Sequence, residues 1–277
     1  ATGKYSEYTR NVLQKRKIHF LQTIGREEEA EQLIAANMEI VEIRMEVVEQ
    51  AIEQEDFSRA RELIAEGIAI AQRKEHPGTV SRWEKVLLRV AELENDTESF
   101  RFLAKKFAFD RGLNQEYYTM WKASFTTAEW HEVVEAHIQS VIAEEKAKTR
   151  RFSWDNLDRA LFKELAPIYV EEKQWERLLQ LIPPEPSERI LRYVHPHLSK
   201  RYPKEMLTIY LPALEEMCER AGNRKQYRSL AQLMKKITQD IAGSHTAIDE
   251  LAAAFIARHP RRRAMKDEFR LILGVLP

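Results

Sequence analysis

A few residues of this sequence have types and spacings that are compatible with chemistry. In the stretch His131-Glu132-Val133-Val134-Glu135, a histidine and a glutamate stand at positions i and i+4, where one helix face would present both to a metal ion. The helix of a zinc protease carries a second histidine at the position that Glu135 occupies here. A weak metal site is one interpretation of this stretch, and an ordinary exposed helix surface is the one that the sequence favours.

The other histidines and the single cysteine indicate structure rather than catalysis. His-Pro occurs at His76, His195 and His259, each near a predicted helix end, and proline keeps the residue before it out of the α region. We therefore interpret all three His-Pro pairs as markers of helix ends. This includes the potential metal chelate at His195–His197. Cys218 lies on the apolar side of its predicted helix, which indicates a buried side chain. A lone cysteine also excludes an intrachain disulfide and a thiolate-rich zinc cage.

Sequence signatures of common enzymes are absent. The chain has no Gly-rich phosphate loop, no Gly-x-Ser-x-Gly elbow and no carboxylate pair set apart from the charged helix faces. We therefore expect a protein that is not an enzyme and that has no cofactor and no bound metal.

An aromatic cluster is the first candidate for binding a partner. It consists of Tyr117, Tyr118, Trp121, Phe125 and Trp130. The helical spacing of Tyr118, Trp121 and Phe125 favours a core between two helical hairpins. In the alternative interpretation, Tyr117, Tyr118 and Trp121 line an anchor pocket on a concave surface, where large aromatic residues serve as binding hot spots.

The basic carboxyl end is the second candidate. Its cations are Arg258, His259, Arg261, Arg262, Arg263, Lys266 and Arg270. The whole chain has a net charge of zero, but residues 251–277 hold 6 Lys and Arg against 2 Asp and Glu, whereas residues 1–100 hold 14 against 20. We expect Arg261, Arg262 and Arg263 to begin a helix and to point outward, and they and Lys266 are the residues expected to meet phosphate or an acidic peptide. A solvated cap at the end of a repeat array is the alternative, which the sequence favours.

The elements that position these residues are predicted to be helices. The chain of 277 residues has only 8 glycines, and no segment alternates as a strand would. After each of several polar turns, an aromatic or short residue is followed three positions later by a residue of the packing face. These leading residues are Phe57, Thr97, Trp130, Trp175 and Tyr227. Their irregular spacing predicts an all-α, α-α superhelix, a TPR-like solenoid of degenerate helical hairpins.

The helix-period patterns and their breaks give expected boundaries. We predict one long helix over 30–52 and a second after it from Phe57, in which the small residues Ala60 and Gly67 let a neighbouring helix approach. Further predicted helices span 79–94, 97–109, 115–124, 128–145, 154–171, 175–181, 187–193, 203–220, 224–241, 247–257 and 263–273.

Breaks in these patterns suggest how the chain is divided. The polar run 146–151 and the proline-rich stretch 183–186 are the predicted linkers, and Pro167 and Pro212 are expected to kink or to begin helices. We expect amino-terminal hairpin repeats over 1–146 and carboxyl-terminal repeats over 152–277. The chain opens without methionine, which suggests a processed or excised piece of a longer protein.

The order of several motifs resembles a known family. These motifs are Gly25–Glu31, Glu55–Leu63, His76-Pro77-Gly78 leading into Trp83, Tyr117-Tyr118, Trp130, Trp175–Leu179, Asn223–Tyr227 and His259–Arg263. Together they resemble the helical region that follows a SWIM-type zinc finger in bacterial proteins. The resemblance implies a bacterial helical solenoid. The zinc finger needs a Cys-x-Cys pair and a Cys-x-His pair, which a chain with one cysteine cannot supply.

Two functions are compatible with these features. The first is a non-catalytic scaffold in the cytoplasm that binds a protein or peptide. The sequence favours it because it predicts repeated helical hairpins and contains no set of residues arranged for catalysis. The alternative is an accessory nucleic-acid-binding protein that uses the basic carboxyl end. No apolar run approaches the roughly 18 residues of a membrane span, so we expect no membrane partner, and we expect no small-molecule substrate.

Overall fold

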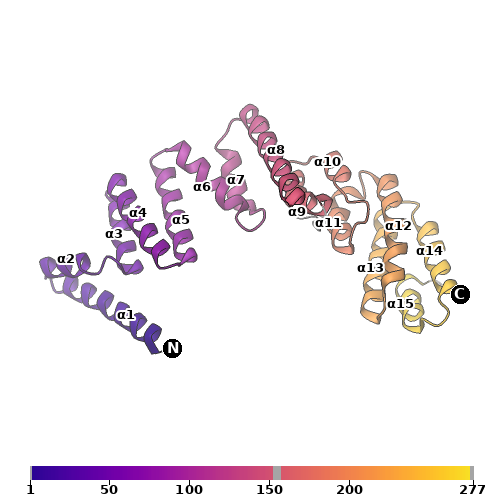
Figure 1. The fold of residues 1–277 in the computed structure, drawn as a ribbon, viewed down its shortest axis with the longest axis horizontal. Coiled ribbons are helices and arrows are strands. Elements are labelled where there is room, and N and C mark those ends of the chain that lie inside the picture. Colours follow the sequence, from indigo (N-terminus) through magenta and orange to yellow (C-terminus); the bar gives the residue numbers. More distant parts are fainter. Residues whose placement is uncertain (1, 152–156, 275–277) are drawn as a thin grey trace. The chain divides into compact units, whose positions relative to one another are not determined.

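The structure is a computed structural model that describes residues 2–151 and 157–274, with side chains placed over 9–149 and 157–274. The described residues form an all-α fold without a β-strand, which confirms the predicted fold class (Figure 1). The helices are α1 (Thr2–Thr23), α2 (Glu27–Ala35), α3 (Val41–Glu53), α4 (Phe57–Arg73), α5 (Pro77–Leu93), α6 (Thr97–Phe109), α7 (Gln115–Ala123), α8 (Thr127–Arg151), α9 (Leu157–Glu171), α10 (Trp175–Gln180), α11 (Glu188–Leu198), α12 (Pro203–Arg220), α13 (Arg224–Asp240), α14 (His245–Arg258) and α15 (Arg263–Leu273).

Contacts divide the chain into two units, Ala1–Trp130 and His131–Pro277. In the first, helices pack on their neighbours in sequence order, as α3, α4 and α5 do in Figure 1, which is the α-α superhelical arrangement. In the second, α9 to α13 follow the same order, while α12 also packs on α14 and α13 on α15. The division predicted from the sequence, into 1–146 and 152–277, places the boundary further along the chain than the contacts between helices do. It stays a prediction.

One short turn recurs between the helices. Glu55 adopts a left-handed φ of 58°, its N–H donates to the carbonyl of Ile52 (3.0 Å), and the N–H of Asp56 donates to the carbonyl of Ala51 (2.9 Å). These two bonds define a Schellman motif. Asp56 is also the N-cap of α4, where its side chain accepts a hydrogen bond from the N–H of Arg59. The same pair of bonds occurs around Gly25, Glu75, Asn95 and Lys173, so these turns are the physical basis of the repeat.

The small residues of α4 permit the close helix contact that the sequence predicts. Ala60 is fully buried. Gly67 faces the indole of Trp83 on α5 so closely that a Cβ at that position would lie 2.6 Å from Cε2 of the ring. Trp83 is itself 1% exposed and belongs to the core formed by α3, α4 and α5. Glycine at this position is therefore a packing requirement.

The predicted single helix over 30–52 is wrong, because it consists of α2 and α3 with a break between them. Within the break, Asn37 donates its side-chain amide to the carbonyl of Leu33 (2.8 Å), and Ile40 is extended before α3 begins. An asparagine that bonds its own backbone competes with helical hydrogen bonds, which the apolar periodicity does not reveal. The sequence reading also missed α1, whose packing face includes the buried residues Ile18 and Leu21.

Two further boundaries need correction. The run 146–151 is not a linker, because α8 continues through it to Arg151. Lysine, arginine and alanine are strong helix formers, and Lys148 pairs with Glu145 on the same helix (2.5 Å). The predicted helix start at Trp154 lies outside the described residues. Pro167 and Pro212 lie inside α9 and α12, so the alternative that they begin helices is wrong.

None of the described helices is both long and apolar enough to cross a bilayer.

Candidate functional site

The predicted aromatic cluster belongs to the core of the first unit. Tyr118, Trp121 and Trp130 are 1%, 2% and 3% exposed. The ring centroids of Trp121 and Trp130 lie 4.8 Å apart, and those of Tyr118 and Trp130 5.6 Å apart, both in edge-to-face geometry. Phe109, which the sequence reading left out, packs edge-on against Tyr118 (5.9 Å). Burial favours the core interpretation, and of the three proposed anchors only Tyr117 keeps partial exposure.

The His131–Glu135 stretch presents a carboxylate that is already paired. Glu135 on α8 accepts from Arg177 of α10 (2.7 Å) and from Gln139, and these bonds hold its pKa below the usual range. Among the residues that the structure describes, no three His, Cys, Asp or Glu side chains come together as metal ligands. Cys218 is buried, and burial raises the pKa of its thiol to about 12, so the thiolate is not populated near neutral pH.

The interpretation of His195 as a marker of a helix end is wrong. It lies inside α11, is 1% exposed and bridges two helices. Its Nε2 lies 2.8 Å from a carboxylate oxygen of Asp240, and its Nδ1 lies 2.7 Å from the hydroxyl of Tyr210. An ionised carboxylate only accepts, so Nε2 donates and Nδ1 accepts from Tyr210. At His76 and His259 the prediction is confirmed, because these residues cap α5 and α14.

Much of the basic carboxyl end is neutralised by α12. Arg258 pairs with Glu215 (3.2 Å) and Glu219 (3.1 Å). Arg262 donates to the backbone carbonyl of Cys218 (3.0 Å), so the expectation that it points outward is wrong. The sequence could not show this contact, because it joins helices far apart along the chain.

The acidic residues of α15 form ion pairs with arginines of α13. Glu268 is buried and accepts from Arg224 (3.0 Å) and Arg228 (2.9 Å) of α13, and Asp267 also pairs with Arg224. These ion pairs therefore hold α15 against α13. They do not neutralise the cations of the basic carboxyl end. Three remaining cations, Arg263, Lys266 and Arg270, share one face of α15 at positions i, i+3 and i+7. None of the three has an ion-pair partner among the described residues.

An apolar groove between α9 and α11 was not predicted from the sequence. It encloses about 370 Å³ and is lined by Phe162, Ala166, Pro167, Ile190 and Tyr193 together with Arg159, Lys163 and Arg189. The rings of Phe162 and Tyr193 pack edge-to-face at 5.9 Å, and Tyr193 is 37% exposed. Pro167 has no N–H, so the carbonyl of Lys163 lacks its usual helical donor.

Cationic side chains lie on both sides of the groove. Arg159 and Lys163 come from α9 and Arg189 from α11, and all three are exposed. Over the described residues no carboxylate lines the groove, and Lys163 is paired with Glu164 (2.6 Å) outside the lining. Burial, and secondarily the charge of Glu171, raises the pKa of Tyr193. The groove therefore combines an aromatic floor with cations.

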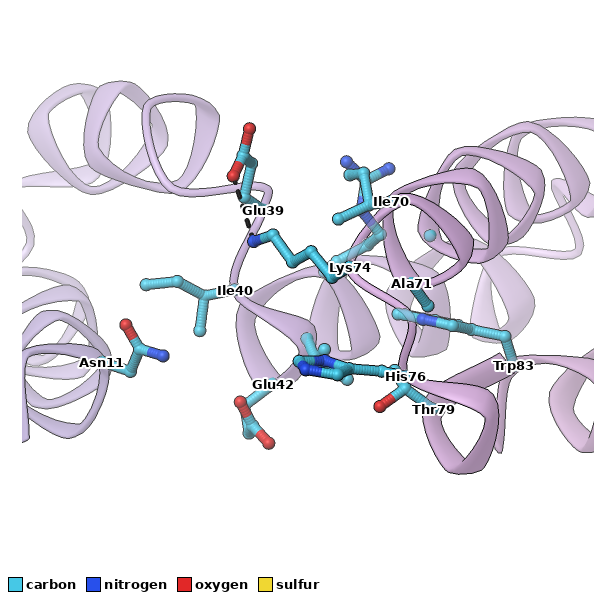
Figure 2. A pocket seen from close by; sticks show the side chains of 13 residues that line it. Asn11, Glu39, Ile40, Glu42, Ile70, Ala71, Lys74, His76, Thr79 and Trp83 are labelled. Atoms are coloured by element: carbon cyan, nitrogen blue, oxygen red, sulfur yellow. Dashed lines mark hydrogen bonds and ion pairs between the residues drawn. The ribbon is translucent and has the colours of Figure 1, made fainter. Parts of the chain in front are cut away.

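A smaller pocket of about 130 Å³ lies in the first unit (Figure 2). It is bounded by α1, the segment before α3, α3 itself, the end of α4 and the start of α5. Figure 2 shows the indole of Trp83 reaching into it beside Ala71, with His76 below and Asn11 on the opposite side. The Trp83 Nε1 and Asn11 Oδ1 atoms are both buried, and neither has a hydrogen-bond partner within the described part of the chain.

Comparisons with protein-family models, with curated proteins and with solved structures found no match.

Proposed function

We propose that the protein is a non-catalytic helical-repeat scaffold that binds a protein partner, with the groove between α9 and α11 as its docking surface. The observation that carries this proposal is an apolar groove that has exposed cations on both sides and, among the described residues, no carboxylate in its lining. Its rigid aromatic floor provides an anchor site, and its cations favour acidic residues beside the anchor. The partner segment expected here is a short peptide that combines an aromatic or aliphatic anchor with Asp or Glu.

The resemblance to a SWIM-associated helical region is compatible with this proposal and stays a prediction. It adds no residue to the groove, because none of the residues that carry the resemblance lines it.

A defined peptide tests the groove. A fluorescent peptide with alternating acidic and aromatic residues should bind the full chain, as measured by anisotropy, and its version with lysine in place of each acidic residue should not. Tyr193→Ala should weaken binding at least about tenfold, because a partly exposed aromatic anchor is lost without opening the core. Arg189→Glu should weaken it further by repulsion.

The matched control is Phe102→Ala, which removes an aromatic residue that is 69% exposed and belongs to the other unit. It should leave the affinity unchanged. Equal affinity of wild type and Tyr193→Ala for the acidic peptide would show that the groove is not the docking surface.

Three cations of α15 that have no ion-pair partner among the described residues favour a second candidate, binding of nucleic acid at the carboxyl end. Arg263, Lys266 and Arg270 form one cationic stripe, and the three together would give a salt dependence with a slope of roughly −2 to −3 for phosphate contact. Replacing the three with glutamine should abolish binding of single-stranded DNA at low salt and leave peptide binding intact. Retained DNA binding would remove this candidate.

A further inference from the structure

A row of aromatic rings continues from the groove of the second unit along α11. The ring centroid of Tyr193 lies 5.9 Å from that of His197, which is one turn further along the helix. His197 stacks on Trp175 of α10, with centroids 5.8 Å apart and ring planes 12° apart. The indole can reach α11 because α10 packs against both α9 and α11 (Figure 1). This aromatic row, Phe162, Tyr193, His197 and Trp175, is longer than the groove itself.

Each end of the aromatic row has an exposed arginine. Arg189 lines the groove near the start of α11. Arg201 lies in a turn that continues α11, because the N–H of Tyr202 donates to the carbonyl of Leu198 (2.8 Å). The guanidinium carbon of Arg201 lies 5.0 Å from the ring centroid of Trp175. Neither guanidinium forms an ion pair with a residue that the structure describes, so both are available to an acidic partner.

The middle of the aromatic row favours uncharged side chains. Burial raises the pKa of Tyr193, and the charge of Glu171 adds to this shift, so the carboxylate lies near the phenol. Burial also lowers the pKa of His197, which leaves its imidazole neutral at pH 7. An acidic group of a partner would therefore be repelled beside Tyr193 and attracted at the two ends of the row.

The spacing along α11 matches that of an extended chain. Four residues of a helix rise about 6 Å. Two residues of an extended chain advance about 6.6 Å, and their side chains point to the same side. A peptide that lies along α11 can therefore place alternate side chains on residues that follow one another at intervals of four. These residues are Arg189, Tyr193, His197 and Arg201.

We propose that the partner of the groove is an extended segment of about seven residues that lies along α11, with an acidic residue at each end and apolar or aromatic residues on the same face between them. The acidic residues pair with Arg189 and Arg201, and the central side chains pack on Tyr193 and His197. This segment rests on the proposed function and extends its docking surface from the groove to Arg201.

Single-stranded nucleic acid is another polymer that binds to cations and aromatic rings. Stacked bases need free ring faces, whereas Trp175 already stacks with His197 and has Arg201 over its ring. The carboxylate of Glu171 near Tyr193 would also repel a phosphate backbone. Both observations favour a peptide.

The test measures the binding of labelled peptides to the full chain by anisotropy at physiological ionic strength. The probe is Glu-Ser-Phe-Ser-Phe-Ser-Glu with blocked ends, and in two variants glutamine replaces its first or its last glutamate. The probe should bind at least about threefold more tightly than either variant, because each variant loses one charge pair. Arg201→Gln should weaken binding of the probe by a similar factor. It should not affect the variant that lacks the glutamate facing Arg201.

The matched control is Lys200→Gln, which removes the same charge from the exposed residue beside Arg201. It should change the affinity for the probe by less than about twofold. Unchanged binding of the probe by Arg201→Gln, together with weaker binding by Tyr193→Ala, would overturn the extended segment and leave the groove as the docking surface.

Two further outcomes separate this proposal from the others. If the probe does not bind while the peptide with alternating acidic and aromatic residues does, only the extended segment is overturned. If neither peptide binds, the proposed function falls with it. An oligothymidylate that binds more tightly than the probe, and that loses affinity in Arg201→Gln, would overturn the choice of a peptide.

Discussion

At the scale of single residues, the imidazole of His195 is held by two partners that fix its tautomer. Asp240 and Tyr210 occupy its two ring nitrogens, and Asp240 also pairs with Lys236 (3.1 Å). Burial lowers the pKa of His195, and so, more weakly, do the charges of Lys236 and Arg192, while the bond to Asp240 opposes the shift. The folded chain therefore holds this histidine neutral where an exposed histidine would begin to gain a proton.

The free energy of unfolding should consequently fall in mild acid. Because the folded-state pKa lies below the ordinary value of 6.5, the unfolded chain binds a proton first as the pH drops. The stabilisation is fully present above 6.5 and is lost as the pH falls from there through the folded-state pKa. Urea unfolding at pH 7.5 and 5.5 should show this loss, and His195→Gln should reduce it by at most about 1.4 kcal/mol for each unit of pKa shift.

The control is His245→Gln, which changes an exposed residue that pairs with Asp249 on its own helix. It should keep the wild-type loss between the two pH values. The same loss in His195→Gln as in wild type would contradict the assignment of the acid sensitivity to the buried imidazole.

At the scale of helices, the contact between α4 and α5 depends on one missing side chain. Gly67→Ala would place a Cβ within 2.6 Å of the Trp83 ring, and the indole would have to move. Overpacking of this kind costs about 1–3 kcal/mol, which outweighs the roughly 0.5–1 kcal/mol that alanine gains over glycine inside a helix. We expect Gly67→Ala to lower the melting temperature and the free energy of unfolding.

Gly78→Ala provides the matched comparison. This glycine lies near the start of α5 and has open space where its Cβ would stand. The substitution should be neutral or stabilising by up to about 1 kcal/mol. If both variants shifted stability in the same direction and by the same amount, the close approach of Trp83 to α4 would not exist in solution.

At the scale of the whole molecule, periodicity predicted most of the fold because each helix has its own apolar face. The predicted bounds of the helices beginning at Thr97, Pro203 and Arg263 agree with the structure. The break after Ala35 was missed because it depends on the side chain of Asn37, which leaves no trace in apolar spacing. α8 was predicted too short because a polar run was read as a linker when its residues favour helix.

The candidate sites were far less predictable than the helices. The groove joins Phe162 of α9 to Tyr193 of α11, and the pocket joins Asn11 of α1 to Trp83 of α5. Periodicity places each residue on a helix face but does not say which faces meet. Similarly, a row of arginines indicated a basic end. Only the structure shows that Arg258 forms an ion pair with α12 and that Arg262 donates a hydrogen bond to the backbone of α12.

The recurring Schellman turn restricts how this sequence can change in length. In these turns, the left-handed residue is followed directly by the cap of the next helix, as Glu55 is by Asp56. An inserted or deleted residue would rotate the following helix by about 100° and turn its apolar stripe away from its neighbour. Insertions and deletions should thus be tolerated in the looser connections, such as 36–40, 110–114 and 181–187, while the Schellman turns keep a constant length.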